Sequence, residues 1–110
     1  MHPRTVRLVD PSGAVLATAR VADEGGYYGG TIDLGETPAE LRALFDEFEE
    51  VVNGQMFAFL DDVQARIAAH PLRAVFDDGC EVPVKDLQVF PGTGDVSFRP
   101  AGACSPAASP

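Results

Sequence analysis

The chain has few basic side chains, and they are scattered along its length. Eight lysine and arginine residues stand against 17 acidic residues, which gives a formal net charge of −9 over 110 residues. Binding to nucleic acids depends largely on Lys and Arg side chains that displace counterions from phosphates. No basic stripe is present in the sequence, which argues against direct binding of DNA or RNA.

Long apolar runs and clusters of cysteine are also missing. No apolar stretch approaches the roughly 18 residues of a membrane span, and the N-terminus lacks the features of a secretory signal. We therefore expect a cytoplasmic protein that does not associate with membranes. The spacing of Cys80 and Cys104 fits neither a zinc site nor a disulfide framework. We expect a free thiol at Cys104, with a Cys80–Cys104 bridge as the alternative in an oxidising compartment.

Catalytic motifs are equally scarce. The sequence has only two histidines and no Ser-His-Asp pattern, metal-ligand cluster or cofactor motif. His70 and Cys80, with Asp77 or Asp78, could in principle form a cysteine nucleophile, a base and an orienting group. A histidine at a helix end is also explained by the helix dipole, and a strand cysteine acts as a small apolar residue. The sequence thus favours a non-catalytic protein and predicts no catalytic residue, no cofactor and no metal ion.

The composition is typical of one globular domain, with 45% hydrophobic and 23% charged residues. We assign residues 1–99 to a single α+β domain. Residues 100–110 contain only small residues and proline, with no side chain large enough to offset the entropy lost on ordering. This segment is predicted to be a disordered tail.

Alternating apolar and polar residues predict strands on both sides of a central helix. Residues 4–9 and 14–21 alternate in this way and flank a turn at residues 10–13, which predicts a hairpin. A third strand is expected at residues 27–34, where Gly29 and Gly30 indicate a bulge or the close approach of another backbone. Three or four further strands are expected between residues 72 and 99.

The residues from Pro38 to Ala69 carry a long apolar seam at helical spacing. Thr37, Pro38 and Glu40 match a capping box at its start. A continuous helix of this length would reach about 48 Å, whereas typical strands span about 17–20 Å. The helix could bend at Asn53-Gly54, and an αα-hairpin is a third option, although two residues are few for a reversal. We expect an antiparallel sheet of six or seven strands, in the order β-β-β-α-β-β-β, curled around one long helix that is either straight or kinked.

This mismatch in length predicts self-association. A small sheet would leave the second half of the seam uncovered, and Phe57 widens the apolar arc there. The sequence therefore predicts a homo-oligomer that forms through four residues, namely Met56, Phe57, Leu60 and Val63.

Acidic residues are concentrated along the same helical segment. Eight of them lie between Glu36 and Asp62, against Arg42 alone. They are explained by a solvated helix face, or alternatively by a docking surface for a basic protein partner centred on Glu47 and Glu50.

The segment from Gly25 to Gly30 encloses Tyr27 and Tyr28. It matches no phosphate-binding fingerprint and has no basic residue nearby. Adjacent strand residues face opposite sides, so one ring should pack inward while the other is exposed and able to contact a ligand. The alternative function is therefore a small-ligand-binding protein or an enzyme that uses this loop.

Overall fold

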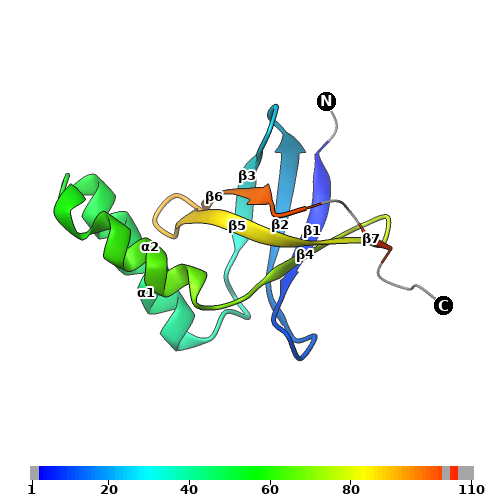
Figure 1. Ribbon diagram of the computed structural model, residues 1–110, viewed down its shortest axis with the longest axis horizontal. Coiled ribbons are helices and arrows are strands. Elements are labelled where there is room, and N and C mark those ends of the chain that lie inside the picture. Colours follow the sequence, from blue (N-terminus) through cyan, green and yellow to red (C-terminus); the bar gives the residue numbers. More distant parts are fainter. Residues whose placement is uncertain (1–2, 103–104, 107–110) are drawn as a thin grey trace.

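The strands form an antiparallel barrel that closes on itself (Figure 1). The computed structural model describes residues 3–102 and 105–106. Neighbouring strands follow the order β4-β1-β2-β3-β6-β5, and pairing between β4 and β5 closes the barrel. Its strands are β1 (Arg4–Val9), β2 (Val15–Asp23), β3 (Tyr28–Asp33), β4 (Arg73–Phe76), β5 (Cys80–Phe90) and β6 (Asp95–Pro100). A two-residue strand, β7 (Ser105–Pro106), pairs with the start of β5.

The barrel consists of two three-stranded meanders, β1-β2-β3 and β4-β5-β6. The meanders join where β1 pairs with β4 and where β3 pairs with β6. Local turns connect the strands within each meander. The first turn is held by the Asp10 carboxylate, which accepts hydrogen bonds from the backbone amides of Ser12 (2.9 Å) and Ala14 (3.0 Å). The turn predicted at residues 10–13 is therefore confirmed.

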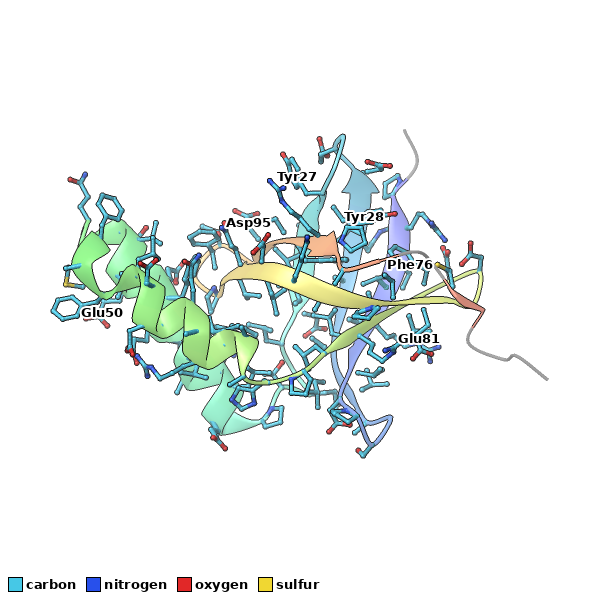
Figure 2. The ribbon with its side chains drawn as sticks, viewed as in Figure 1. Tyr27, Tyr28, Glu50, Phe76, Glu81 and Asp95 are labelled. Atoms are coloured by element: carbon cyan, nitrogen blue, oxygen red, sulfur yellow. The ribbon has the colours of Figure 1, made fainter. Side chains whose placement is uncertain are left out.

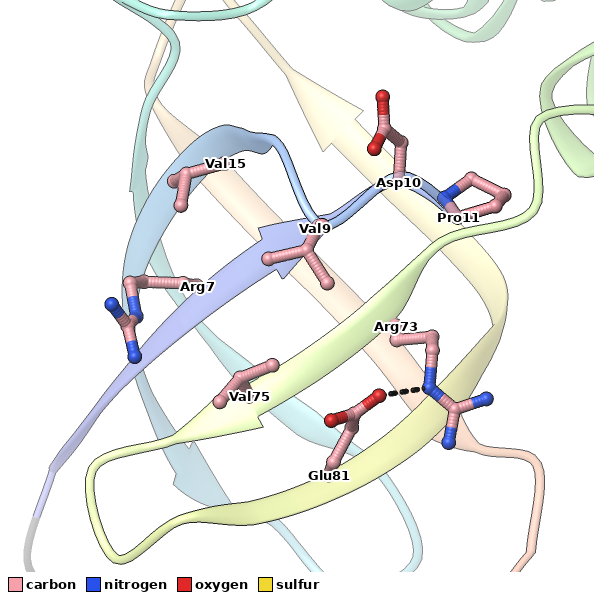
Figure 3. A pocket seen from close by; sticks show the side chains of 9 residues that line it. Arg7, Val9, Asp10, Pro11, Val15, Arg73, Val75 and Glu81 are labelled. Atoms are coloured by element: carbon pink, nitrogen blue, oxygen red, sulfur yellow. Dashed lines mark hydrogen bonds and ion pairs between the residues drawn. The ribbon is translucent and has the colours of Figure 1, made fainter. Parts of the chain in front are cut away.

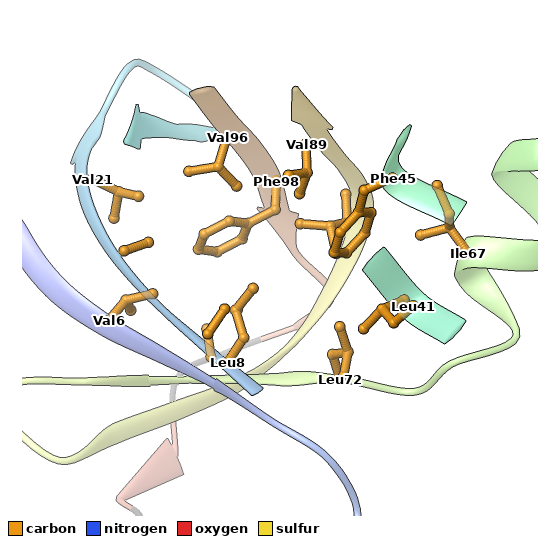
Figure 4. Close-up of a cluster of buried hydrophobic side chains, with 14 of the residues drawn as sticks. Val6, Leu8, Val21, Leu41, Phe45, Ile67, Leu72, Val89, Val96 and Phe98 are labelled. Carbon is orange, nitrogen blue, oxygen red and sulfur yellow. The ribbon is translucent and has the colours of Figure 1, made fainter. Parts of the chain in front are cut away.

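The inward faces of the strands and the helices share one apolar core (Figure 4). The Tyr28 ring lies at one side of this core, with its centroid 5.1 Å from that of Phe76 and 5.4 Å from that of Phe98. Among the described residues, no buried side-chain nitrogen or oxygen lacks a hydrogen-bond partner. The largest fully buried side chains are Phe45, Phe48, Phe98, Leu8, Val6, Val21, Val63 and Val89.

The central helical segment is a hairpin of two helices, α1 (Ala39–Asn53) and α2 (Leu60–Ala68), with the short 3₁₀ helix η1 (Phe57–Phe59) between them. The chain reverses directly after α1. The Gln55 amide donates to the Val52 carbonyl (3.1 Å), and the Met56 amide donates to the Val51 carbonyl (2.9 Å). Gln55 adopts a φ of +56° in this turn. This is the left-handed geometry of a Schellman-type helix end.

The structure corrects the expected fold. The prediction of one long helix wrapped by a sheet is wrong, because the sheet closes on itself and the helices pack beside the barrel against β5. The apolar seam is folded back rather than extended, so both of its halves reach the core. The turn also uses Gln55, Met56 and η1 in addition to Asn53-Gly54, which provides enough residues for the reversal.

The start of α1 also differs from the prediction. Its N-cap residue is Pro38, and no side chain caps the helix. The Thr37 hydroxyl instead donates to the Leu16 carbonyl at 2.7 Å, which ties the start of the helical segment to β2. The capping box is therefore wrong, because Thr37 bonds to the neighbouring strand.

Part of the predicted disordered tail, residues 100–110, lies outside the described residues. Ser105 and Pro106 pair with β5, whereas residues 103–104 and 107–110, including Cys104, are not among the described residues. Within the described ranges, none of the helices has both the length and the apolar character needed to cross a membrane.

Candidate interaction surfaces

The end of the helical hairpin exposes three large apolar side chains. Met56 is 36% exposed, and Phe57 and Phe59 are each 61% exposed. These three residues, termed the hairpin tip, lie where the hairpin projects farthest from the barrel (Figure 1). Phe57 and Phe59 are more exposed than any other large apolar residue that the structure describes.

The hairpin tip is exposed because the chain reverses there. The left-handed Gln55 and the 3₁₀ turn of η1 carry Phe57 and Phe59 beyond the reach of the barrel core. Leu60 is half-buried, and Val63 is completely buried. Of the four residues predicted to mediate self-association, only Met56 and Phe57 thus belong to the exposed tip, and Val63 is part of the core.

The acidic residues of α1 have different environments. Glu47 forms an ion pair with Arg66, which holds the pKa of Glu47 below its usual value. Glu49 accepts a hydrogen bond from the Gly92 amide (3.0 Å) and thereby ties α1 to the β5–β6 turn. Glu50 is exposed at the tip end of α1 (Figure 2) and forms no ion pair within the described residues. Of the two acidic residues predicted to bind a basic partner, only Glu50 lacks an ion pair in the part of the chain that the structure describes.

The two tyrosines differ as expected from their adjacency. Tyr28 packs in the aromatic cluster with Phe76 and Phe98. Tyr27 is 41% exposed. It lines a hollow of about 400 Å³ beside Asp95, and a second hollow of about 350 Å³ that also includes Asp86. Tyr27 is therefore the tyrosine available for a ligand contact.

A larger groove of about 610 Å³ lies between α2 and β5. No sequence motif pointed to it, because its walls come from segments that are separated in the chain. Its lining is mainly apolar and includes Ile67, Leu72 and Leu87. Polar side chains also line it, namely Asp61, Gln64, His70, Lys85 and Asp86.

A smaller hollow of about 300 Å³ lies on the outer wall of the barrel (Figure 3). Arg7 and Arg73 line it together with Val9 and Val75, and Arg73 forms an ion pair with Glu81, which also lines it. This ion pair joins β4 to β5, which gives the two charged side chains a structural role.

Two of the residues considered for a cysteine nucleophile, Cys80 and Asp78, have structural contacts. The described part of the chain contains no free cysteine, so Cys80 supplies no thiolate. The Asp78 carboxylate accepts a hydrogen bond from the Cys80 amide (2.9 Å). This bond and the nearby Arg4 hold the pKa of Asp78 below its usual value. Among the described residues, no group of three or more His, Cys, Asp or Glu side chains is placed to hold a metal ion.

No known family, curated protein or solved structure matches this chain. A functional assignment must therefore come from the surfaces described above. The hairpin tip, the Tyr27 hollows and the groove between α2 and β5 are the three candidates.

Proposed function

We propose that this protein is a non-catalytic interaction module that docks a basic protein partner through its hairpin tip. The observation that carries this proposal is the exposure of Phe57 and Phe59 on a hairpin whose remaining apolar seam packs against the barrel. Exposed apolar patches rimmed by polar residues mark interaction sites. Aromatic residues and methionine are enriched at the centres of such interfaces.

The charges beside the tip support a basic partner. Glu50 in the last turn of α1 and Asp61 in the first turn of α2 are both exposed, and neither forms an ion pair within the described residues. The net charge of −9 adds a long-range attraction for cations. Two tips facing one another would bring these carboxylates together, and like charges across an interface are unfavourable. A basic protein therefore fits this surface better than a second copy of the chain.

Self-association loses its original motivation in this structure. The prediction depended on a helix too long for its sheet, and the hairpin removes that mismatch. The predicted homo-oligomer and the predicted role of Leu60 and Val63 in it stay predictions. Burial of Val63 in the core means that its substitution would report on folding as well as on association.

The proposal can be tested with a designed amphipathic helical peptide that carries Lys on one face and Leu on the other. NMR titration of the protein should show saturable shifts at Met56, Phe57 and Phe59. Phe57→Ser should weaken binding at least tenfold, and raising the salt concentration should weaken it further. The matched control is Val15→Ser, which alters an exposed apolar residue on the barrel and should leave affinity unchanged.

Two results would contradict the proposal. One is binding that Phe57→Ser and salt do not affect. The other is a dimer in sedimentation experiments that Phe57→Ser converts to a monomer, since this would make the tip a contact between two copies of the chain.

The Tyr27 hollows support a second candidate function, the binding of a small ligand. The specific observation is that one exposed ring lines both hollows. Soluble fragments with a planar ring are suitable probes, because aromatic rings stack on tyrosine. Binding that maps to Tyr27 by NMR and is lost in Tyr27→Ala would support this function, and fragments that bind equally well to Tyr27→Ala would exclude it.

A further inference from the structure

The groove between α2 and β5 has the size and lining of a small-molecule site. Its volume of about 610 Å³ lies within the range of about 300–1,000 Å³ that is usual for such sites. Buried side chains of Ile67, Leu72 and Leu87 form part of its apolar lining. None of the hairpin tip residues lines the groove, and Asp61 is the residue that the groove shares with the charges beside the tip.

The strand that forms one wall is distorted at this point. Lys85 pairs with Arg99 and Gln88 pairs with Ser97, so two residues of β5 lie opposite a single residue of β6. This is a β-bulge, a feature that redirects side chains and is common beside functional sites. Asp86, inside the bulge, has a φ of +53°, a left-handed conformation that is strained for most residues other than glycine.

The bulge places consecutive side chains in different environments. Leu87 is buried, whereas Lys85 and Asp86 are both exposed on the rim of the groove. In a regular strand, adjacent side chains alternate between the two faces. The bulge thus brings an ammonium group and a carboxylate to the rim beside an apolar lining.

One positive charge at this rim lacks an ion-pair partner among the described residues. Lys85 is the only lysine of the chain, and it forms no ion pair with any residue that the structure describes. The Asp86 carboxylate lies 3.8 Å from the Arg99 guanidinium. Asp61 lies in the first turn of α2, where the helix dipole stabilises negative charge. An anionic group on a ligand would therefore find its partner at Lys85.

We propose that this groove binds a small amphipathic carboxylate. The apolar body of the ligand would pack on Ile67, Leu72 and Leu87, and its carboxylate would accept a hydrogen bond from the Lys85 ammonium group. The bulge at Asp86 serves to hold Lys85 at the rim.

Octanoate, octylammonium and octanol share one apolar chain and differ in charge, so they test this proposal directly. Titrations followed by NMR should show saturable shifts for octanoate at α2 and at Lys85–Gln88. Octanoate should bind at least tenfold more tightly than octylammonium. Tighter binding of octylammonium, or shifts of all three probes that never saturate, would overturn the proposal.

Substitutions at the rim separate charge recognition from apolar contact. Lys85→Gln should weaken octanoate binding about tenfold and leave octanol binding unchanged, and Lys85→Arg should restore most of the affinity. The matched control is Arg20→Gln, which removes an exposed positive charge of β2 that does not line the groove and should change octanoate affinity less than twofold. Equal octanoate binding by wild type and Lys85→Gln would refute the assignment.

A further variant keeps this test distinct from the protein-docking proposal. Phe57→Ser removes an apolar side chain of the tip and should leave octanoate binding intact. Octanoate binding that depends on Phe57 and not on Lys85 would place the probe at the tip and overturn the groove assignment, whatever the outcome of the peptide experiment.

Discussion

Substitution of Gly30 by alanine should separate two barrel strands. Gly30 lies in β3 directly opposite Val21 of β2. A Cβ atom at this position would lie 1.9 Å from the carbonyl oxygen of Arg20 and 2.8 Å from its carbonyl carbon. Both atoms belong to the backbone of β2, so no side-chain rotation can relieve the overlap. Ordinary contact begins near 3.4 Å, and the strands must move apart to reach it.

The expected cost is at the upper end of what overpacking produces. Added methyl groups in well-packed cores typically cost about 1–3 kcal/mol, and a rigid backbone neighbour makes about 3 kcal/mol or more the expected loss for Gly30→Ala. A small domain loses about 4–8 °C in melting temperature per kcal/mol. We therefore expect the melting temperature to fall by roughly 12–24 °C on this scale.

Gly29→Ala is the matched control, one position earlier in the same strand. Its Cβ would meet the Tyr27 ring at 3.4 Å, an ordinary contact. Because glycine inside a strand is about 0.5–1 kcal/mol less favourable than alanine, this variant should be as stable as wild type or slightly more stable. Urea unfolding followed by circular dichroism measures both. The reasoning fails if the free energy of unfolding of Gly30→Ala lies within about 1 kcal/mol of that of wild type. It also fails if both variants lose stability equally.

Three further substitutions test local features. Gln55→Gly should raise the free energy of unfolding by about 1 kcal/mol, because glycine adopts the left-handed φ of this turn without strain; an unchanged urea midpoint would contradict this. Glu49→Ala removes the acceptor of the Gly92 amide, so that amide should exchange its hydrogen faster in NMR, while amides of β1 serve as the reference. The Ser12 hydroxyl, followed by the Ala14 amide, holds the pKa of Asp10 below its usual value of 3.8. The stability from Asp10 is thus present above pH 3.8 and lost as the pH falls through the lowered pKa; Asp10→Asn should be less stable at pH 7 and lose less on acidification, and parallel acid-unfolding curves would refute it.

Features that depend on neighbouring residues could be predicted from the sequence. The turn at residues 10–13 follows from the Asp10 side chain and Gly13, which bond locally. The close approach of another backbone at Gly30 is confirmed by the Arg20 carbonyl. The opposite environments of Tyr27 and Tyr28 were predicted from the alternation of strand residues, although β3 begins only at Tyr28. Each of these features is set within a few positions along the chain or by strand geometry alone.

Closure of the barrel depends on pairings that a local pattern does not encode. β1 pairs with β4 and β3 pairs with β6, across most of the length of the chain. The apolar seam of residues 38–69 also looks the same whether it is straight or folded back. A left-handed turn at Gln55 determines that the seam folds back, and glutamine is not typical of that conformation.

The candidate sites were predicted only in part for the same reason. Phe57 was singled out because it widens the apolar arc in the second half of the seam, and it is exposed. Val63 was singled out because it belongs to the same half of the apolar seam. It is buried, because the hairpin turns it toward the barrel. The groove between α2 and β5 had no sequence signal, because its bulge is centred on Asp86 rather than on a glycine.

The order of strand pairing has a consequence for biosynthesis. As the chain leaves the ribosome, β1, β2 and β3 can pair with one another, but the outer edges of β1 and β3 wait for β4 and β6. Unpaired edges are templates for aggregation, and β6 is the last of the barrel strands to be translated. A product that stops before Asp95 would keep the edge of β3 open, so premature termination would yield an aggregation-prone fragment rather than a smaller folded protein.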